Sequence, residues 1–247
     1  MKKPAVVKPT DDVTLVGHIC GTPVVVKDTT WLPMTEFAVW LLMSWLAGRG
    51  HDDRPWWKRL GTGALTMSAI LGSEWCHNLA HAAAARSIGK PMDALRVTWG
   101  MPLLVYYDIN DRTVSPRQHI FRALGGPVCN ALLLLLALCS RRLIKQGTVP
   151  GNVVNAAVGM NTFLVSALLL PIPGLDGGPI LKWSLVDRGA TPEEADETVR
   201  AVNRVAGSGL GIAAGIALKR RRRFLGSLLA LFATLSLAVG FGLLKEQ

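Results

Sequence analysis

The sequence predicts an all-α polytopic membrane protein with about six transmembrane helices, a short N-terminal β-hairpin and a membrane-associated β segment. Half of the 247 residues are hydrophobic, and the mean hydropathy of +0.32 is high for a soluble domain. Several apolar runs are long enough to cross a bilayer, and no separate soluble domain fits between them. We therefore expect one transmembrane domain over residues 1–247.

Two segments are predicted to be extended rather than helical. Residues 13–26 are rich in β-branched side chains and are interrupted by Gly21 and Pro23, which is typical of a hairpin. Residues 92–116 are also β-prone, are broken by Gly100 and Pro102, and contain a turn at 108–111. Non-helical backbone at membrane depth requires shelter, so we expect this segment to lie against the membrane domain.

Five apolar runs predict full crossings, because each is about as long as the hydrocarbon core of a bilayer requires. They are Trp31–Ala47, Gly61–Ala85, His119–Cys139, Val153–Pro173 and Phe224–Leu244. A sixth run, Gly207–Leu218, is short for a crossing. If its span begins near Ala201, it includes Arg204 and forms the first arm of a C-terminal helical hairpin over about 201–244.

Charge and capping signals add to this topology. The formal net charge is +10, and its densest part, Lys219–Arg223, lies between two apolar runs, as a juxtamembrane anchor does. No aromatic platform accompanies this basic run, so nucleic acid is not an expected partner. Thr191, Pro192 and Glu194 predict the capped start of a helix before the run.

Basic residues also follow the second apolar run, which favours a cytoplasmic N-terminus. They are Arg86, Lys90, Arg96, Arg112, Arg117 and Arg122. With six full crossings, however, Lys219–Arg223 falls on the outer side, against the positive-inside tendency. A fifth segment that does not cross would remove this conflict.

The second apolar run carries the most informative residues of the chain. His77 and His81 are four residues apart, so on a helix both imidazoles lie on one face and can bind one metal ion. Glu74 and Asn78 share the same helical stripe. Ionisable residues inside a bilayer are costly, and they therefore mark a functional site.

Two further polar elements interrupt the apolar runs. Gly126, Pro127 and Asn130 open the third run, where the glycine permits close helix packing and the asparagine either satisfies a freed carbonyl or orients a ligand. The segment Pro171–Gly178 ends the fourth run with two prolines and several glycines. Asp176 in this segment, considered alone, predicts a helix cap.

Together these segments resemble the site-2 protease family of intramembrane zinc metalloproteases. Residues 17–24 resemble the hairpin that opens many members, and His77–His81 stands where the family has His-Glu-x-x-His. Gly126–Asn130 resembles Gly-Pro-x-x-Asn, and Pro171–Gly178 resembles Pro-x-Pro-x-Leu-Asp-Gly-Gly. The resemblance runs from residue 15 to about residue 205, with a metal-site core at about 60–185.

The resemblance implies a zinc cofactor held by His77, His81 and Asp176, supported by Gly126, Pro127 and Asn130. Three protein ligands leave a fourth position for water, as in catalytic zinc sites. The implied activity is hydrolysis of a peptide bond in a transmembrane protein substrate within the lipid bilayer. The resemblance also implies a multi-pass topology with the N-terminus in the cytoplasm.

The chain departs from the family in two places. Asn78 occupies the position of the motif glutamate, and an amide cannot accept a proton near neutral pH. Leu168 stands three residues before Pro171, where many members have asparagine. Glu74, one turn before Asn78, is a candidate substitute base, although helical side chains lean toward the N-terminus and away from the histidine pair.

These departures leave two main hypotheses open. The chain is either a working zinc protease with an unusual base, or an inactive homologue that binds metal and holds transmembrane client helices without cutting. An introduced change at Asn78 would give the same sequence as a natural one. Two histidines and a carboxylate also match the non-haem iron triad, and chance histidines in a membrane protein are the simplest alternative.

Overall fold

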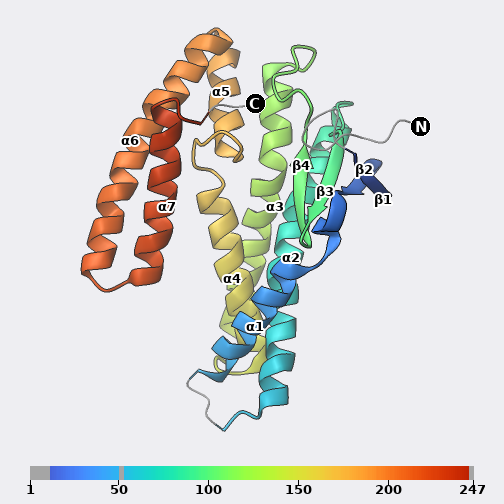
Figure 1. Ribbon diagram of the computed structural model, residues 1–247, viewed down its shortest axis with the longest axis vertical. Helices are drawn as coiled ribbons and strands as arrows, with labels where there is room; N and C mark the ends of the chain where they lie inside the picture. Colours follow the sequence, from blue (N-terminus) through green and yellow to red (C-terminus); the bar gives the residue numbers. More distant parts are fainter. Residues whose placement is uncertain (1–11, 50–52, 245–247) are drawn as a thin grey trace. The chain divides into compact units, whose positions relative to one another are not determined.

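A computed structural model describes residues 12–49 and 53–244. Within these ranges the chain forms seven α-helices and four β-strands (Figure 1). It divides into two compact units, which are described separately. The first unit comprises Met1–Val114 and Gly125–Ser166, and the second comprises Ser115–Leu124 and Ala167–Gln247.

Both predicted extended segments form hairpins, and the two hairpins join in one four-stranded sheet. The strands are β1 (Thr14–Ile19), β2 (Thr22–Val26), β3 (Ala94–Thr98) and β4 (Met101–Val105), in that spatial order. Each hairpin is antiparallel, whereas β2 and β3 pair in parallel. The sequence predicted a hairpin at 13–26 and only an extended segment at 92–116, with its turn at 108–111. It did not predict the second hairpin, which turns at Trp99 and Gly100. Nor did it predict the parallel pairing, which joins residues about 70 positions apart.

The sheet packs against the helix that carries the histidines. Val24 and Leu95, from the two paired inner strands, form a buried cluster with Ala82 and Met92. Ala82 directly follows His81 in the chain. Burial of these apolar side chains therefore fixes the sheet beside the C-terminal half of this helix, next to the histidine pair.

The helices of the first unit follow the predicted apolar runs with changed ends. They are α1 (Met34–Gly48), α2 (Trp56–Ser87), the larger part of α3 (Pro116–Leu143) and α4 (Val149–Ala167). The expected start of the first span at Trp31 is wrong, because residues 28–31 form a separate short 3₁₀ helix before Pro33. The expected end of the fourth span at Pro173 is also wrong, because prolines 171 and 173 cannot continue a helix.

The second unit contains α5 (Gly177–Asp187), α6 (Pro192–Lys219) and α7 (Arg223–Gly240). The predicted capping box is confirmed: Thr191 accepts from the backbone N–H of Glu194, whose carboxylate accepts from the N–H of Thr191. The helix that contains the sixth apolar run, α6, begins at Pro192, before the start near Ala201 that the sequence suggested. Its Arg204 donates to the carbonyl of Gly240 at 2.8 Å, so this charged side chain is satisfied within the helical hairpin.

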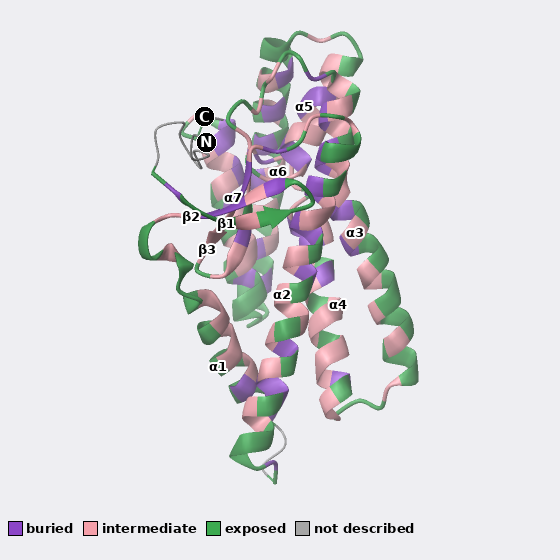
Figure 2. Ribbon diagram, turned by 90° about the vertical axis from the view of Figure 1, so that its right-hand side faces the viewer, coloured by how far each residue is buried: buried purple, intermediate pink, exposed green. Residues whose placement is uncertain are grey.

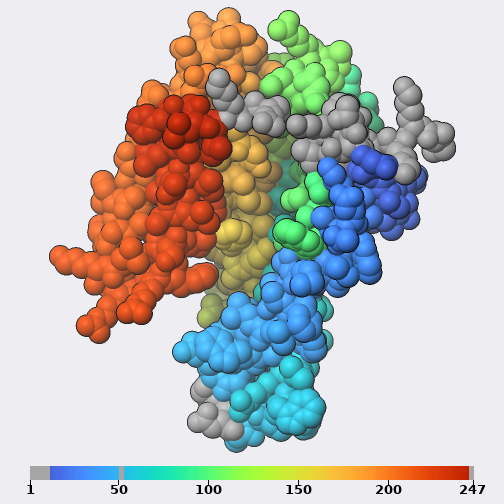
Figure 3. All heavy atoms as spheres, in the orientation of Figure 1, coloured from blue at the N-terminus to red at the C-terminus, as the bar shows by residue number. Residues whose placement is uncertain are grey.

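α6 and α7 lie side by side along their lengths (Figure 1). The basic run Lys219–Arg223 forms the turn between them, and all of its residues are exposed. In the space-filling view, long side chains project from this orange-to-red turn (Figure 3). This position agrees with the predicted juxtamembrane anchor between two apolar helices.

Three of the described helices, α3, α6 and α7, are long and apolar enough to cross a membrane, and α1 is a shorter apolar helix. Large apolar side chains are exposed along α3, including Leu132, Leu135 and Leu136. Figure 2 shows this exposed surface as green on α3. These features support a membrane protein, while the count of about six crossings stays a prediction.

The packing of α1 on α2 gives a first test of this fold. A Cβ added at Gly63 would lie 2.6 Å from the backbone nitrogen of Ser44, whereas one added at Gly61 would meet nothing within 4 Å. Alanine normally favours a helix over glycine by about 1 kcal/mol, but the contact with α1 backbone makes Gly63→Ala an overpacking change that costs about 1–3 kcal/mol.

We expect Gly63→Ala to lower the midpoint of thermal unfolding in detergent, and Gly61→Ala to leave it unchanged or raise it. Equal midpoints for the two variants would contradict the close approach of α1 and α2.

Candidate metal centre

The two motif histidines face each other on α2, as their spacing predicted. Both are buried, with 3% and 1% of their surfaces exposed, and their Nε2 atoms are 3.1 Å apart. The rings stand nearly perpendicular, at 79°. Two nitrogens that bind one tetrahedral zinc ion at about 2.05 Å lie roughly 3.3 Å apart. The pair therefore fits a shared metal ion with almost no rearrangement.

Asn130 on α3 fixes the protonation of His77. Its Oδ1 lies 2.5 Å from Nδ1 of the imidazole. Because its Nδ2 donates to Asn161 and to the carbonyl of Ser73, Oδ1 is the atom that faces the ring and can only accept. Nδ1 must then carry the proton, which leaves the lone pair of Nε2 for a metal. The sequence allowed two roles for Asn130, and its contact with the His77 ring favours the one in which it orients a ligand, which stays a prediction.

A second asparagine, which the sequence analysis did not single out, completes this network. Asn161 on α4 is 1% exposed and accepts from Asn130 at 2.7 Å. It donates to the Ser73 hydroxyl at 2.9 Å and to the Ala157 carbonyl at 2.8 Å. The signal for it was a polar side chain inside an apolar run, where an unsatisfied amide is costly.

Gly125 and Gly126 allow α3 to approach the histidines. A Cβ at Gly126 would overlap the imidazole rings of both His77 and His81. A Cβ at Gly125 would lie 2.7 Å from the carbonyl oxygen of Ala80 on α2. Pro127 follows directly and is accommodated inside α3. The close approach that the sequence predicted for the glycine therefore occurs at the face of α2 that carries both histidines.

Asn78 lies beside the histidines but offers no base. It is 5% exposed, and its Nδ2 donates to the backbone carbonyl of Glu74 at 2.9 Å, one turn earlier in the same helix. This bond orients the amide along α2, and an amide in any orientation remains neutral. Glu74 is half-buried one turn toward the N-terminus of α2.

Asp176 belongs to the second unit, at the end of the turn between α4 and α5. It occupies the N-cap position of α5, as predicted, but its side chain makes no capping hydrogen bond there. The turn is closely packed: a Cβ at Gly178 would lie 2.6 Å from the carbonyl oxygen of Ile172. The backbone thus holds this carboxylate at a helix start without using it as a cap.

Leu168, the second departure from the family pattern, lies just beyond the end of α4. Its carbonyl accepts from the N–H of Gly177 at 2.9 Å, and Nδ2 of Asn203 donates to the carbonyl of Pro171 in the same turn. Backbone groups therefore shape this turn. The first unit brings His77, His81, Gly126 and Asn130 together, and the role of Asp176 as a third ligand stays a prediction.

Comparison with known proteins shows the fold. No family profile and no curated protein sequence matches the chain. A solved structure, "Site-2 Protease from Methanocaldococcus jannaschii", is similar with a TM-score of 0.52, covering 93% of this chain and 95% of that chain. The sequence identity is 12%, so the likeness concerns the fold. The chain therefore has a site-2-protease-like scaffold, as the sequence motifs implied.

The hydrogen bond to His77 gives a test of the centre. Loss of a group that orients a metal-binding histidine typically lowers metal affinity by roughly 10–100-fold. We expect Asn130→Ala to weaken zinc binding by this factor in a competition titration with a chelator. Asn155→Ala is the matched control, because Asn155 is an exposed asparagine of α4 that bonds only to Gln146 among the described residues. Equal affinities for both variants would exclude an orienting role for Asn130.

Proposed function

We propose that this chain is a site-2-protease-like membrane protein that holds zinc through His77, His81 and Asp176. The observation that carries the proposal is the facing pair of Nε2 atoms, 3.1 Å apart, on a buried face of α2. Asn130 supports it by holding the proton of His77 on Nδ1. Asp176 is assigned as the third ligand because Pro171–Gly178 resembles the Pro-x-Pro-x-Leu-Asp-Gly-Gly element of site-2 proteases. Two imidazoles and one carboxylate are a common donor set of catalytic zinc.

In this proposal the chain crosses the bilayer about six times, through α1, α2, α3, α4, α6 and α7. The N-terminus lies in the cytoplasm, and the partners are the lipid bilayer and a transmembrane protein, either substrate or client helix. Support comes from the apolar helices α3, α6 and α7 and from the likeness of the fold to a site-2 protease.

The residues around the histidines favour a site with little or no proteolysis. Zinc, when bound, would polarise a peptide carbonyl and acidify its water. The residue that should take the proton from that water is Asn78, whose amide cannot do so. Loss of a general base typically costs on the order of 10²–10⁴ in rate. The chain thus keeps groups that bind metal and lacks the group that completes hydrolysis.

The second candidate is a working protease with Glu74 as its base. Glu74 is a half-buried carboxylate one turn from Asn78, and the preserved histidine pair favours retained chemistry. A carboxylate is able to act as a general base if it reaches the water, directly or through a second water.

The metal assignment predicts that the purified full-length protein contains about one zinc ion per chain. His77→Ala, His81→Ala and Asp176→Ala should each lower the zinc content well below stoichiometric, as measured by elemental analysis. His18→Ala should have no effect, because His18 is exposed on β1. Thermal unfolding of the metal-free variants checks that they are folded. Wild-type content in all of them, or zinc lost equally with His18→Ala, would exclude this ligand set.

The missing base predicts a gain of activity. Asn78→Glu should hydrolyse a transmembrane substrate reconstituted in the same vesicles, with a rate on the order of 10²–10⁴ above the native chain. Asn78→Gln is the matched control, since it adds the same length without a carboxylate. If the native chain already cuts and Glu74→Gln abolishes cutting, the second candidate is correct. If Glu74→Gln cuts equally well, Glu74 is not the base.

A further inference from the structure

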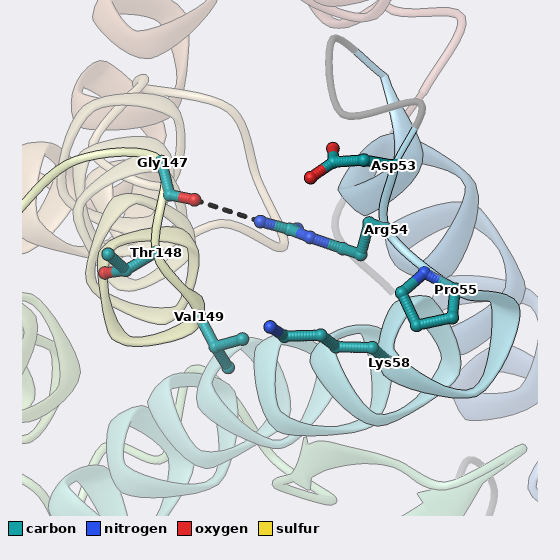
Figure 4. Close-up of a pocket in the computed structure, with 7 residues that line it drawn as sticks. All are labelled: Asp53, Arg54, Pro55, Lys58, Gly147, Thr148 and Val149. Atoms are coloured by element: carbon teal, nitrogen blue, oxygen red, sulfur yellow. Dashed lines mark hydrogen bonds between the residues drawn. The ribbon is translucent and has the colours of Figure 1, made fainter.

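A cavity of about 320 Å³ lies in the first unit, away from the histidines, between the start of α2 and the segment that precedes α4. Asp53, Arg54 and Lys58 line one side, and Gly147, Thr148 and Val149 line the other (Figure 4). The volume is in the range of small-ligand sites. Nothing in the proposed function uses this cavity.

Arg54 is a buried lining residue of the cavity that is held in place by hydrogen bonds. It is 8% exposed, and its guanidinium donates to the carbonyl of Ala47 at 2.7 Å and to that of Gly147 at 2.9 Å. Arg54 thereby joins the end of α1 to the loop at Gly147, which is 93 residues beyond Arg54 in the chain. Both acceptors are neutral carbonyls, so the positive charge of Arg54 is not compensated by them.

Lys58 adds a second positive charge to the same cavity. Its ammonium group and the Arg54 guanidinium both point toward the 147–149 segment (Figure 4). Within residues 12–49 and 53–244, neither cation forms a salt bridge, although Asp53 lines the same cavity. The start of α4 on the opposite wall contributes the positive end of a helix dipole. The described lining residues therefore carry two positive charges and one negative charge, a formal net charge of +1.

The hydroxyl of Thr148 is engaged by groups other than Arg54 and Lys58. Its hydroxyl already donates to the carbonyl of Lys145 at 2.7 Å and accepts from the N–H of Gly151 at 3.2 Å. An arginine has five N–H donors, and two of those of Arg54 are used by the carbonyls. The remaining donors and the Lys58 ammonium are suited to the oxygens of a phosphate group.

The position of the cavity in the chain indicates where that phosphate comes from. Trp56 and Trp57, between the lining residues Pro55 and Lys58, are 72% and 62% exposed. Exposed tryptophans beside basic residues are typical of the membrane–water interface, at the depth of lipid headgroups. We propose that this cavity binds the phosphate group of a phospholipid headgroup, with Arg54 and Lys58 as its ligands.

The test uses the full chain in a nonionic detergent and three probes in calorimetric titrations. The probes are dihexanoyl phosphatidylglycerol, dihexanoyl glycerol without the phosphate, and inorganic phosphate. We expect phosphatidylglycerol to bind, and Lys58→Gln to weaken it roughly 10-fold, as loss of one charged hydrogen bond does. Asp53→Asn should strengthen binding, because it removes the negative charge of the cavity. Arg142→Gln, an exposed basic residue outside the cavity, should leave it unchanged.

Three results would overturn the proposal in whole or in part. If dihexanoyl glycerol binds as well as phosphatidylglycerol, the phosphate is not recognised. If Lys58→Gln and Arg142→Gln weaken binding equally, the attraction is a general effect of surface charge. If inorganic phosphate binds as tightly as phosphatidylglycerol, the cavity recognises phosphate, but the proposal that this phosphate belongs to a lipid is wrong. Lys58 is exposed, so its substitution is not expected to unfold the chain, and thermal unfolding checks this.

Discussion

The hydrogen bond between His77 and Asn130 is the contact on which the proposed metal centre depends. A buried imidazole has two nitrogens, and only one of them can be the metal ligand. Asn130 occupies Nδ1, so Nε2 is left to face the same atom of His81. Asn130 is itself fixed, because its amide donates to Asn161 and to the backbone of Ser73. Three helices, α2, α3 and α4, thus contribute to the orientation of one ring.

This network also explains the small residues around it. Buried polar side chains are tolerated when every donor and acceptor finds a partner, which requires helices at short distance. Gly125 and Gly126 remove the side chains that would keep α3 away from α2. A polar network in an apolar helical unit is therefore coupled to close packing. Without the close packing, the amides of Asn130 and Asn161 would lack partners in a low-dielectric interior.

The fold and the histidine pair of this centre are present, whereas a general base for hydrolysis at position 78 is not. The scaffold has the site-2-protease-like fold, and the histidine pair has the geometry for a metal. Asn78, by contrast, is a neutral amide bonded along its own helix. Metal binding and general-base catalysis depend on different residues, so one can persist when the other is lost. The cavity around Arg54 is separate from the histidine pair, because it is lined by residues at the starts of α2 and α4 and in the segments before them.

The sequence alone determined the local features of this protein. Periodicity placed His77 and His81 on one helical face, β-branched runs indicated the N-terminal hairpin and a second extended segment, and Thr191 with Glu194 indicated a helix start. Each of these depends on residues close together in the chain. Tertiary structure decided the contacts between distant segments. Examples are the pairing of β2 with β3, the bond of Asn161 to Ser73, and that of Arg54 to Gly147. No local pattern encodes such partners, because they arise only when packing brings separate helices and loops together.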